Sequence, residues 1–175
     1  MLDLLSSFEA LPTPSVAGPP GGARFSAAPI DGYELHRLGK DSSGTPSLLV
    51  SVTDAPGIGW PAPIALENLT VQHDVECRIA RPNGGLEQGR FTVVRCMGND
   101  RALQGYFLRA AATIVTLLGE APSHADVTAA IDRLVELFRA MSTAPRKSVQ
   151  GLWAELFLIA RSPRPDTRLH TLRRG

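Results

Sequence analysis

The chain has 175 residues, of which 43% are hydrophobic and 20% charged, a composition typical of one globular domain and marginal for two. No stretch approaches the roughly 18 consecutive apolar residues that a membrane-spanning helix needs, so no membrane partner is expected. The N-terminus carries Asp3 where a signal peptide carries positive charge, and no long apolar run follows. These features predict a cytoplasmic protein.

The net charge of +1 conceals an uneven distribution. Residues 1–138 have a balance of −5, whereas residues 139–175 have a balance of +6. A basic end on an acidic body suggests a polyanionic partner such as DNA. A solvated basic tail without a partner is the alternative interpretation.

The first half of the chain reads mainly as strands. Residues 1–30 are expected to form an irregular arm rich in Pro and Gly. Residues 33–38 and 47–53 are predicted strands joined by a turn at Gly44. The clearest signal is a β-hairpin at about 66–97, because two extended, alternating runs flank the turn sequence Pro82-Asn-Gly-Gly.

The second half reads as three helices. Apolar residues at helical spacing predict helices at about 100–118 and 123–142, and the sequence around 148 predicts a third over 148–161. Strands followed by helices indicate an α+β fold, with an antiparallel sheet packed by helices. We therefore expect an α+β domain over residues 31–145 and a separate segment over 146–175.

The predicted third helix contains one acid, Glu155, on an otherwise apolar face. A buried carboxylate is costly unless it is paired or binds a metal ion. Glu155 is therefore a candidate metal ligand or acid–base group. An ion pair with Arg146, Lys147 or an arginine of the tail is the alternative interpretation.

The run Arg146-Lys-Ser-Val-Gln-Gly-Leu-Trp-Ala-Glu-Leu156 resembles a bacterial group of PD-(D/E)XK nuclease-family proteins found in restriction and phage-defence clusters. Further similarity lies in residues 67–78, 91–96 and 134–139. The resemblance implies that Glu155 matches the acid on the first core helix, where it helps to hold Mg²⁺. It also implies partners such as an ATPase, a helicase-like protein or a DNA methyltransferase.

The chain departs from this family after the predicted third helix. Pro165-Asp166 is followed by no further acid and no lysine, so the Asp/Glu-x-Lys part of a nuclease site is absent. A truncation or frameshift near Thr167 is our explanation. We therefore expect no bound cofactor and no nuclease activity from this chain alone, although the family would be a Mg²⁺-dependent DNA endonuclease.

Other residue patterns give weaker hypotheses. Arg146 and Lys147, followed by Ser148 at the start of the predicted helix, are candidates for contacting a DNA phosphate, with a solvated loop as the alternative. Cys77 and Cys96 are expected to be reduced core residues. An apolar third helix also predicts self-association through exposed surface.

Three functions follow from these patterns. The first is a fragment of a restriction-endonuclease-like protein, without activity by itself. The second is a non-catalytic module that binds a partner protein, and the third is a DNA-binding accessory protein.

Overall fold

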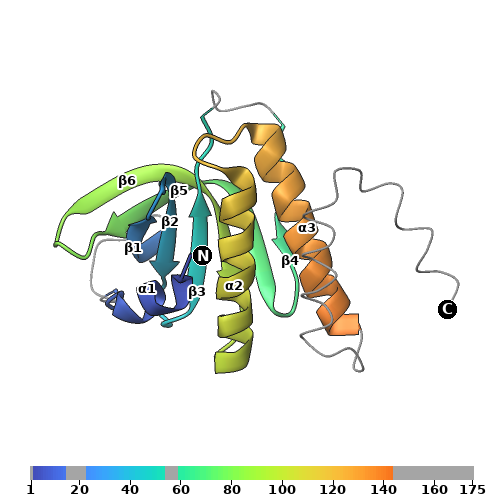
Figure 1. Ribbon diagram of the computed structural model, residues 1–175, viewed down its shortest axis with the longest axis horizontal. Coiled ribbons are helices and arrows are strands. Elements are labelled where there is room, and N and C mark those ends of the chain that lie inside the picture. The colour runs from blue at the N-terminus through green and yellow to red at the C-terminus, as the bar shows by residue number, and fades with distance from the viewer. Residues whose placement is uncertain (1, 15–22, 54–58, 144–175) are drawn as a thin grey trace, which may run out of the picture.

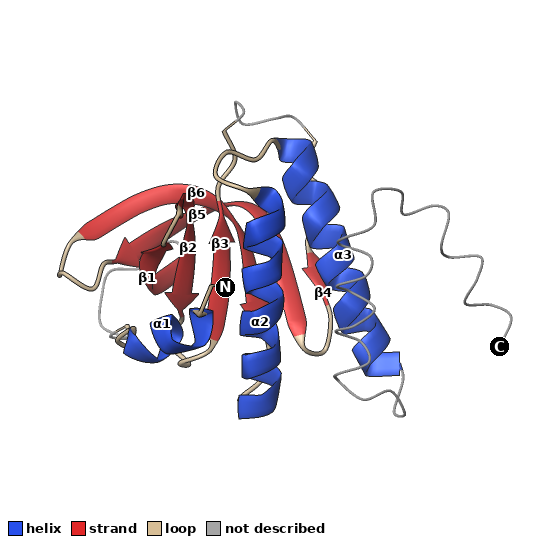
Figure 2. Cartoon of the chain, in the orientation of Figure 1, coloured by secondary structure: helices blue, strands red, loops and turns tan. Residues whose placement is uncertain are grey.

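The computed structural model describes residues 2–14, 23–53 and 59–143. Within these ranges three helices pack against a six-stranded mixed sheet, which confirms the predicted α+β class (Figures 1 and 2). The elements in chain order are α1 (Leu4–Ala10), β1 (Ala23–Ile30), β2 (Tyr33–Lys40), β3 (Pro46–Val50), β4 (Ile64–Ala65), β5 (Leu69–Ala80), β6 (Leu86–Cys96), α2 (Arg101–Leu118) and α3 (His124–Thr143).

Five of the strands close into a barrel. The strand order is β1-β2-β3-β6-β5-β4 with antiparallel neighbours, and β1 also pairs with β5 in parallel. The parallel register runs from Ala23 opposite Cys77 to Ser26 opposite Ala80. The short β4 lies outside the barrel beside β5. The predicted hairpin is confirmed as β5 and β6, and the predicted antiparallel sheet is closed by one parallel pairing.

The expectation of an irregular arm over residues 1–30 was wrong for two segments. Residues 4–10 form α1, which begins at the N-cap Asp3, and residues 23–30 form β1. Neither element was predicted, because α1 is only two turns long and β1 directly follows a run rich in Pro and Gly. Strand β1 pairs with the adjacent β2 on one side and with the distant β5 on the other.

The interior of the barrel is filled by apolar side chains from four strands. Two glycines make room for them, since a Cβ at Gly39 would lie 2.8 Å from Leu49 Cδ1 and a Cβ at Gly89 would lie 2.7 Å from Phe91 Cε2. The buried residues of this cluster are Phe25, Ala27, Leu49, Cys77, Ile79, Phe91 and Val93.

Because of a β-bulge, β5 contributes side chains to two different cores. Between Gln72 and Val75 the strand advances by one residue more than its partner β6. An extra residue reverses which face the following side chains occupy. Val71 therefore packs in the core beneath the helices, whereas Cys77 packs inside the barrel.

The second and larger core lies between the outer surface of the barrel and the three helices. Helix α2 begins at Asp100, whose Oδ2 accepts a hydrogen bond from the Leu103 amide at 3.0 Å. At the start of α3, Ser123 and Asp126 exchange amide-to-side-chain hydrogen bonds. These caps confirm the predicted starts of both helices. In Figure 1, α2 and α3 lie side by side across the sheet.

The predicted helix over 148–161 lies outside the described residues. Among the described helices, none has the length and apolar character required to cross a membrane.

Candidate functional site

None of the site residues predicted from the sequence falls in the described ranges. Glu155, the candidate metal ligand, and Arg146, Lys147 and Ser148, the candidate phosphate contacts, all lie beyond residue 143. We therefore consider which other side chains in residues 2–14, 23–53 and 59–143 could have a chemical role.

Both cysteines are buried and free, as the sequence indicated. Burial raises the pKa of Cys77 to about 11 and that of Cys96 to about 12. A thiol is a nucleophile only as its thiolate, so neither side chain is activated near neutral pH. Both act as small core residues, one inside the barrel and one beneath the helices.

One end of the barrel carries an ion-pair network. Glu87 accepts hydrogen bonds from Arg37 Nη2 at 3.2 Å and from Arg81 Nε at 3.0 Å. Burial opposes ionisation of Glu87, but the hydrogen bonds and charges of Arg81 and Arg37 together hold its pKa below the usual value. A network satisfied in this way is structural in character, because its charges already have partners.

A second polar group surrounds Trp60, which packs between two histidines. The Trp60 ring stacks on His73 at a centroid distance of 4.8 Å and lies 4.0 Å from the ring of His124. His73 Nδ1 lies 3.1 Å from Thr92 Oγ1. Burial and the charge of His124 lower the pKa of His73. The cluster joins Trp60, which follows β3, to β5 and to the start of α3.

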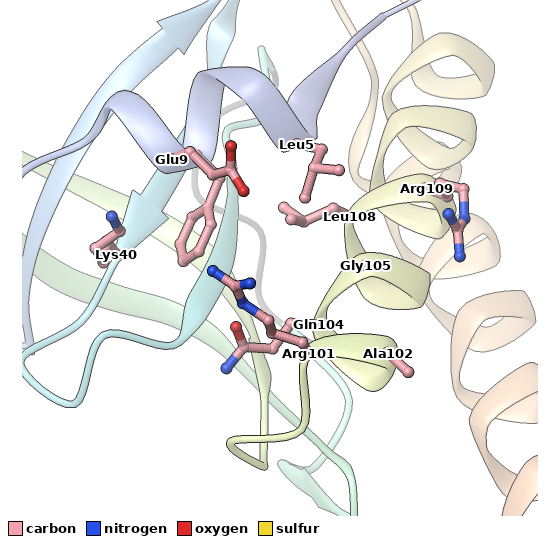
Figure 3. Close-up of a pocket in the computed structure, with 10 residues that line it drawn as sticks. Leu5, Glu9, Lys40, Arg101, Ala102, Gln104, Gly105, Leu108 and Arg109 are labelled. Carbon is pink, nitrogen blue, oxygen red and sulfur yellow. The ribbon is translucent and has the colours of Figure 1, made fainter.

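A cleft with a volume of about 730 Å³ lies between α1 and the first half of α2 (Figure 3). One wall comes from α1, another from α2, and Lys40 contributes from the end of β2. The lining residues are Leu5, Phe8, Glu9, Lys40, Arg101, Ala102, Gln104, Gly105, Leu108 and Arg109. We refer to this site as the α1–α2 cleft.

Lys40 is the most unusual group in the α1–α2 cleft. Its side chain crosses the Phe8 ring, with Nζ 4.5 Å from the ring centroid, and donates a hydrogen bond to the Leu11 carbonyl at 2.5 Å. The residue is 9% exposed. Burial lowers the pKa of Lys40, against the opposing effect of the Glu9 charge. The ammonium group is thus held at the cleft by neutral partners.

Sequence reasoning missed the α1–α2 cleft because it treated α1 as part of an irregular arm. A signal was present: Asp3 is a suitable N-cap, and Leu4, Phe8 and Leu11 follow at the i, i+4, i+7 spacing of a buried helical face. Lys40 is separated from the two arginines that line the cleft, Arg101 and Arg109, by about 60 to 70 residues, so no local motif marks the three together.

Three observations bear on metal binding and ancestry. Across the part of the chain that the structure describes, no group of three or more His, Cys, Asp or Glu side chains is placed to hold a metal ion. The carboxylates of Glu155 and Asp166, which lie outside the described residues, are oxygen donors of the kind Mg²⁺ prefers. No protein-family model matches the chain, and neither a curated protein nor a solved structure shows detectable similarity to it.

Proposed function

We propose that this chain is a cytoplasmic, restriction-endonuclease-like protein of a DNA restriction or phage-defence system, in which the barrel and its helices form a non-catalytic module. The observation that carries the proposal is the run Arg146–Leu156, which resembles the first core helix of PD-(D/E)XK proteins and begins three residues after the last described helix. Glu155 in this run is the only residue of the chain to which the resemblance gives a metal-binding role.

The distribution of charge supports different functions for the described ranges and for the C-terminal residues. The described ranges carry 11 Lys and Arg side chains against 14 Asp and Glu, whereas residues 144–175 carry seven against two. Non-specific affinity for DNA comes mainly from cations near the phosphates. Contact with DNA is therefore assigned to the residues around Arg146 and Lys147, and partner binding to the barrel and helices.

DNA binding provides the test of this division. The full chain should bind a fluorescently labelled duplex in an anisotropy assay, with an affinity that falls steeply between 50 and 300 mM NaCl. Replacing Arg146 and Lys147 by Ala should weaken binding and reduce the salt slope by about one for each phosphate that no longer has a cation beside it. Arg133→Ala, which removes an exposed cation from α3, is the matched control and should leave the slope unchanged. Equal binding by the wild type and the double variant would exclude this assignment.

A second candidate function, a module that binds a partner protein without DNA, is favoured by the net negative charge of the described ranges. The partner would be an ATPase, helicase-like protein or methyltransferase of the same defence operon. Co-purification of such a partner after nuclease treatment, unaffected by the Arg146 and Lys147 replacements, would support this second function over the first.

A further inference from the structure

Helix α1 is the shortest of the described helices and depends on the rest of the fold for its stability. It spans seven residues, Leu4–Ala10. Isolated helices shorter than about 12 to 15 residues are marginal in water. Its contacts with β2 and α2 must therefore maintain it, and they come from one apolar face, on which Leu4, Phe8 and the C-cap Leu11 are buried.

Hydrogen bonds attach α1 only weakly to the other elements. At its start, the Asp3 side chain accepts hydrogen bonds from the amide and the hydroxyl of Ser6, both within the same segment. Within the described ranges, one hydrogen bond joins α1 and its caps to another element, from Lys40 Nζ to the Leu11 carbonyl. Strand β1, in contrast, is hydrogen-bonded to β2 on one side and to β5 on the other. The backbone of α1 is therefore held far less firmly than that of β1.

Clefts border α1 on two opposite sides. The α1–α2 cleft is lined by Leu5, Phe8 and Glu9 of α1. A second cleft of about 410 Å³ faces the turn between β1 and β2, and Leu4, Ser7 and Leu11 line it. At 100° per residue these two sets of side chains project from different sides of the helix. Because packing stabilises a segment through contacts between atoms, open space on both sides limits the contacts that hold α1.

Docking of α1 also buries a charge. The Lys40 ammonium group lies against the Phe8 ring and the Leu11 carbonyl, both of which belong to the α1 segment. Among the described residues, no carboxylate lies within ion-pair distance of Lys40. Burial lowers the pKa of Lys40 despite the nearby charge of Glu9, because an unpaired ammonium group is better solvated in water. Displacement of α1 returns this group to water and so favours an open state.

We propose that α1, together with its caps Asp3 and Leu11, is a displaceable strap that opens and closes while the barrel, α2 and α3 stay folded. Opening uncovers Lys40 and the apolar side chains of Leu38 and Leu108, which line the two clefts beside α1. Residues 12–22, which connect the strap to β1, have the Pro- and Gly-rich composition of a linker. The strap lets the protein cover or expose an apolar surface without global unfolding, and this inference does not depend on the proposed function.

Hydrogen exchange of the ¹⁵N-labelled full chain at low urea concentrations tests the strap. The amides of residues 7–11 should be protected relative to an unfolded chain, yet exchange about a hundredfold faster than the amides in the middle of α2, after correction for intrinsic rates. Their exchange should depend little on urea, because opening exposes little surface. Absence of any protection in α1, or exchange with the rate and urea dependence of α2, would overturn the proposal.

Two variants make this test specific. Phe8→Ala removes the largest buried side chain of α1 and should speed exchange in α1 by about tenfold or more, with exchange in α2 and β5 unchanged. Leu5→Ala changes an exposed position of the same helix and is the matched control, which should exchange as the wild type does. Equal acceleration of α1, α2 and β5 in Phe8→Ala would contradict an independent opening.

Acetylation of Lys40 by acetic anhydride distinguishes displacement of the whole strap from fraying of its first turn. Lys147 is the other lysine of the chain and serves as the reference in the same mass spectrum. Phe8→Ala should raise the ratio of Lys40 to Lys147 acetylation by about tenfold, and Leu5→Ala should leave it unchanged. An unchanged ratio in Phe8→Ala would show that α1 does not control access to Lys40, and would overturn the proposal.

Discussion

His36 Nε2 lies 3.1 Å from the carbonyl oxygen of Gly119, which links the middle of β2 to the residue that ends α2. The imidazole is fully buried, and Nδ1 has no hydrogen-bond partner among the described residues. The neutral tautomer with its proton on Nε2 fits this contact, since that nitrogen then donates to the carbonyl. Protonation of Nδ1 would place an unpaired charge in the core.

This contact predicts acid sensitivity. Burial lowers the pKa of His36, and burial also lowers the pKa of His73. Because the unfolded chain has histidine pKa values near 6.5, it binds more protons than the folded state below that pH. The free energy of unfolding should be nearly constant between about pH 7.5 and 8 and fall below pH 6.5, by at most about 1.4 kcal/mol per pH unit for each histidine.

Urea unfolding of the full chain at several pH values between 5 and 8 measures this slope. His36→Gln should be less stable at pH 7.5 but should lose stability less steeply on acidification. A slope in the variant equal to that of the wild type would contradict the role given to His36.

Replacing each of two glycines, one inside α2 and one at its C-cap, by alanine should change the free energy of unfolding in opposite directions. Gly119 has a φ of +72° at the C-cap, where alanine is strained, so Gly119→Ala should lower the free energy of unfolding by about 1 kcal/mol. Gly105 lies in the helix interior with open space at its Cβ position, so Gly105→Ala should raise it by about 0.5 to 1 kcal/mol. Chemical denaturation checks both. Two changes of the same sign would show that these helix positions are misassigned.

The bulge in β5 depends on the backbone of Asp74, which has a φ of +53°. Arg90 holds this residue through Nε to Oδ1 at 2.7 Å and Nη2 to the backbone carbonyl at 2.7 Å. Asp74→Gly removes an exposed ion pair worth about 0 to 1 kcal/mol but relieves the strain, so stability should change little. Asp74→Val places a β-branched residue at positive φ and should cost about 2 kcal/mol. Thermal melts of the two variants, if indistinguishable, would argue against the bulge.

The sequence predicted those elements whose signals are local. The hairpin turn at Pro82 and the starts of the helices near residues 100 and 123 were predicted correctly, because each depends on residues adjacent in the chain. The reversal of face at Asp74 was not visible, because apolar residues occupy the same alternate positions on both sides of the bulge.

The barrel and the cleft could not be predicted for a different reason. Strand β1 pairs with β5, about 54 residues later, and only that long-range contact closes the barrel. The cleft is lined by residues from α1, from the end of β2 and from α2, which are far apart in the sequence. Neither the pairing of β1 with β5 nor the grouping of the cleft residues requires a fixed spacing in the sequence, so no sequence pattern predicts them. The predicted site around Glu155 lies outside the described residues and stays a prediction.

Cleavage of supercoiled plasmid DNA by the purified full chain, with Mg²⁺ or Mn²⁺, tests the central claim most directly. The chain contains Glu155 but lacks the Asp/Glu-x-Lys part of a nuclease site, so its cleavage should not exceed that of the Glu155→Gln variant with either metal ion. Metal-dependent cleavage by the wild type that disappears in Glu155→Gln would contradict the account, because it would show that this chain completes a nuclease site by itself.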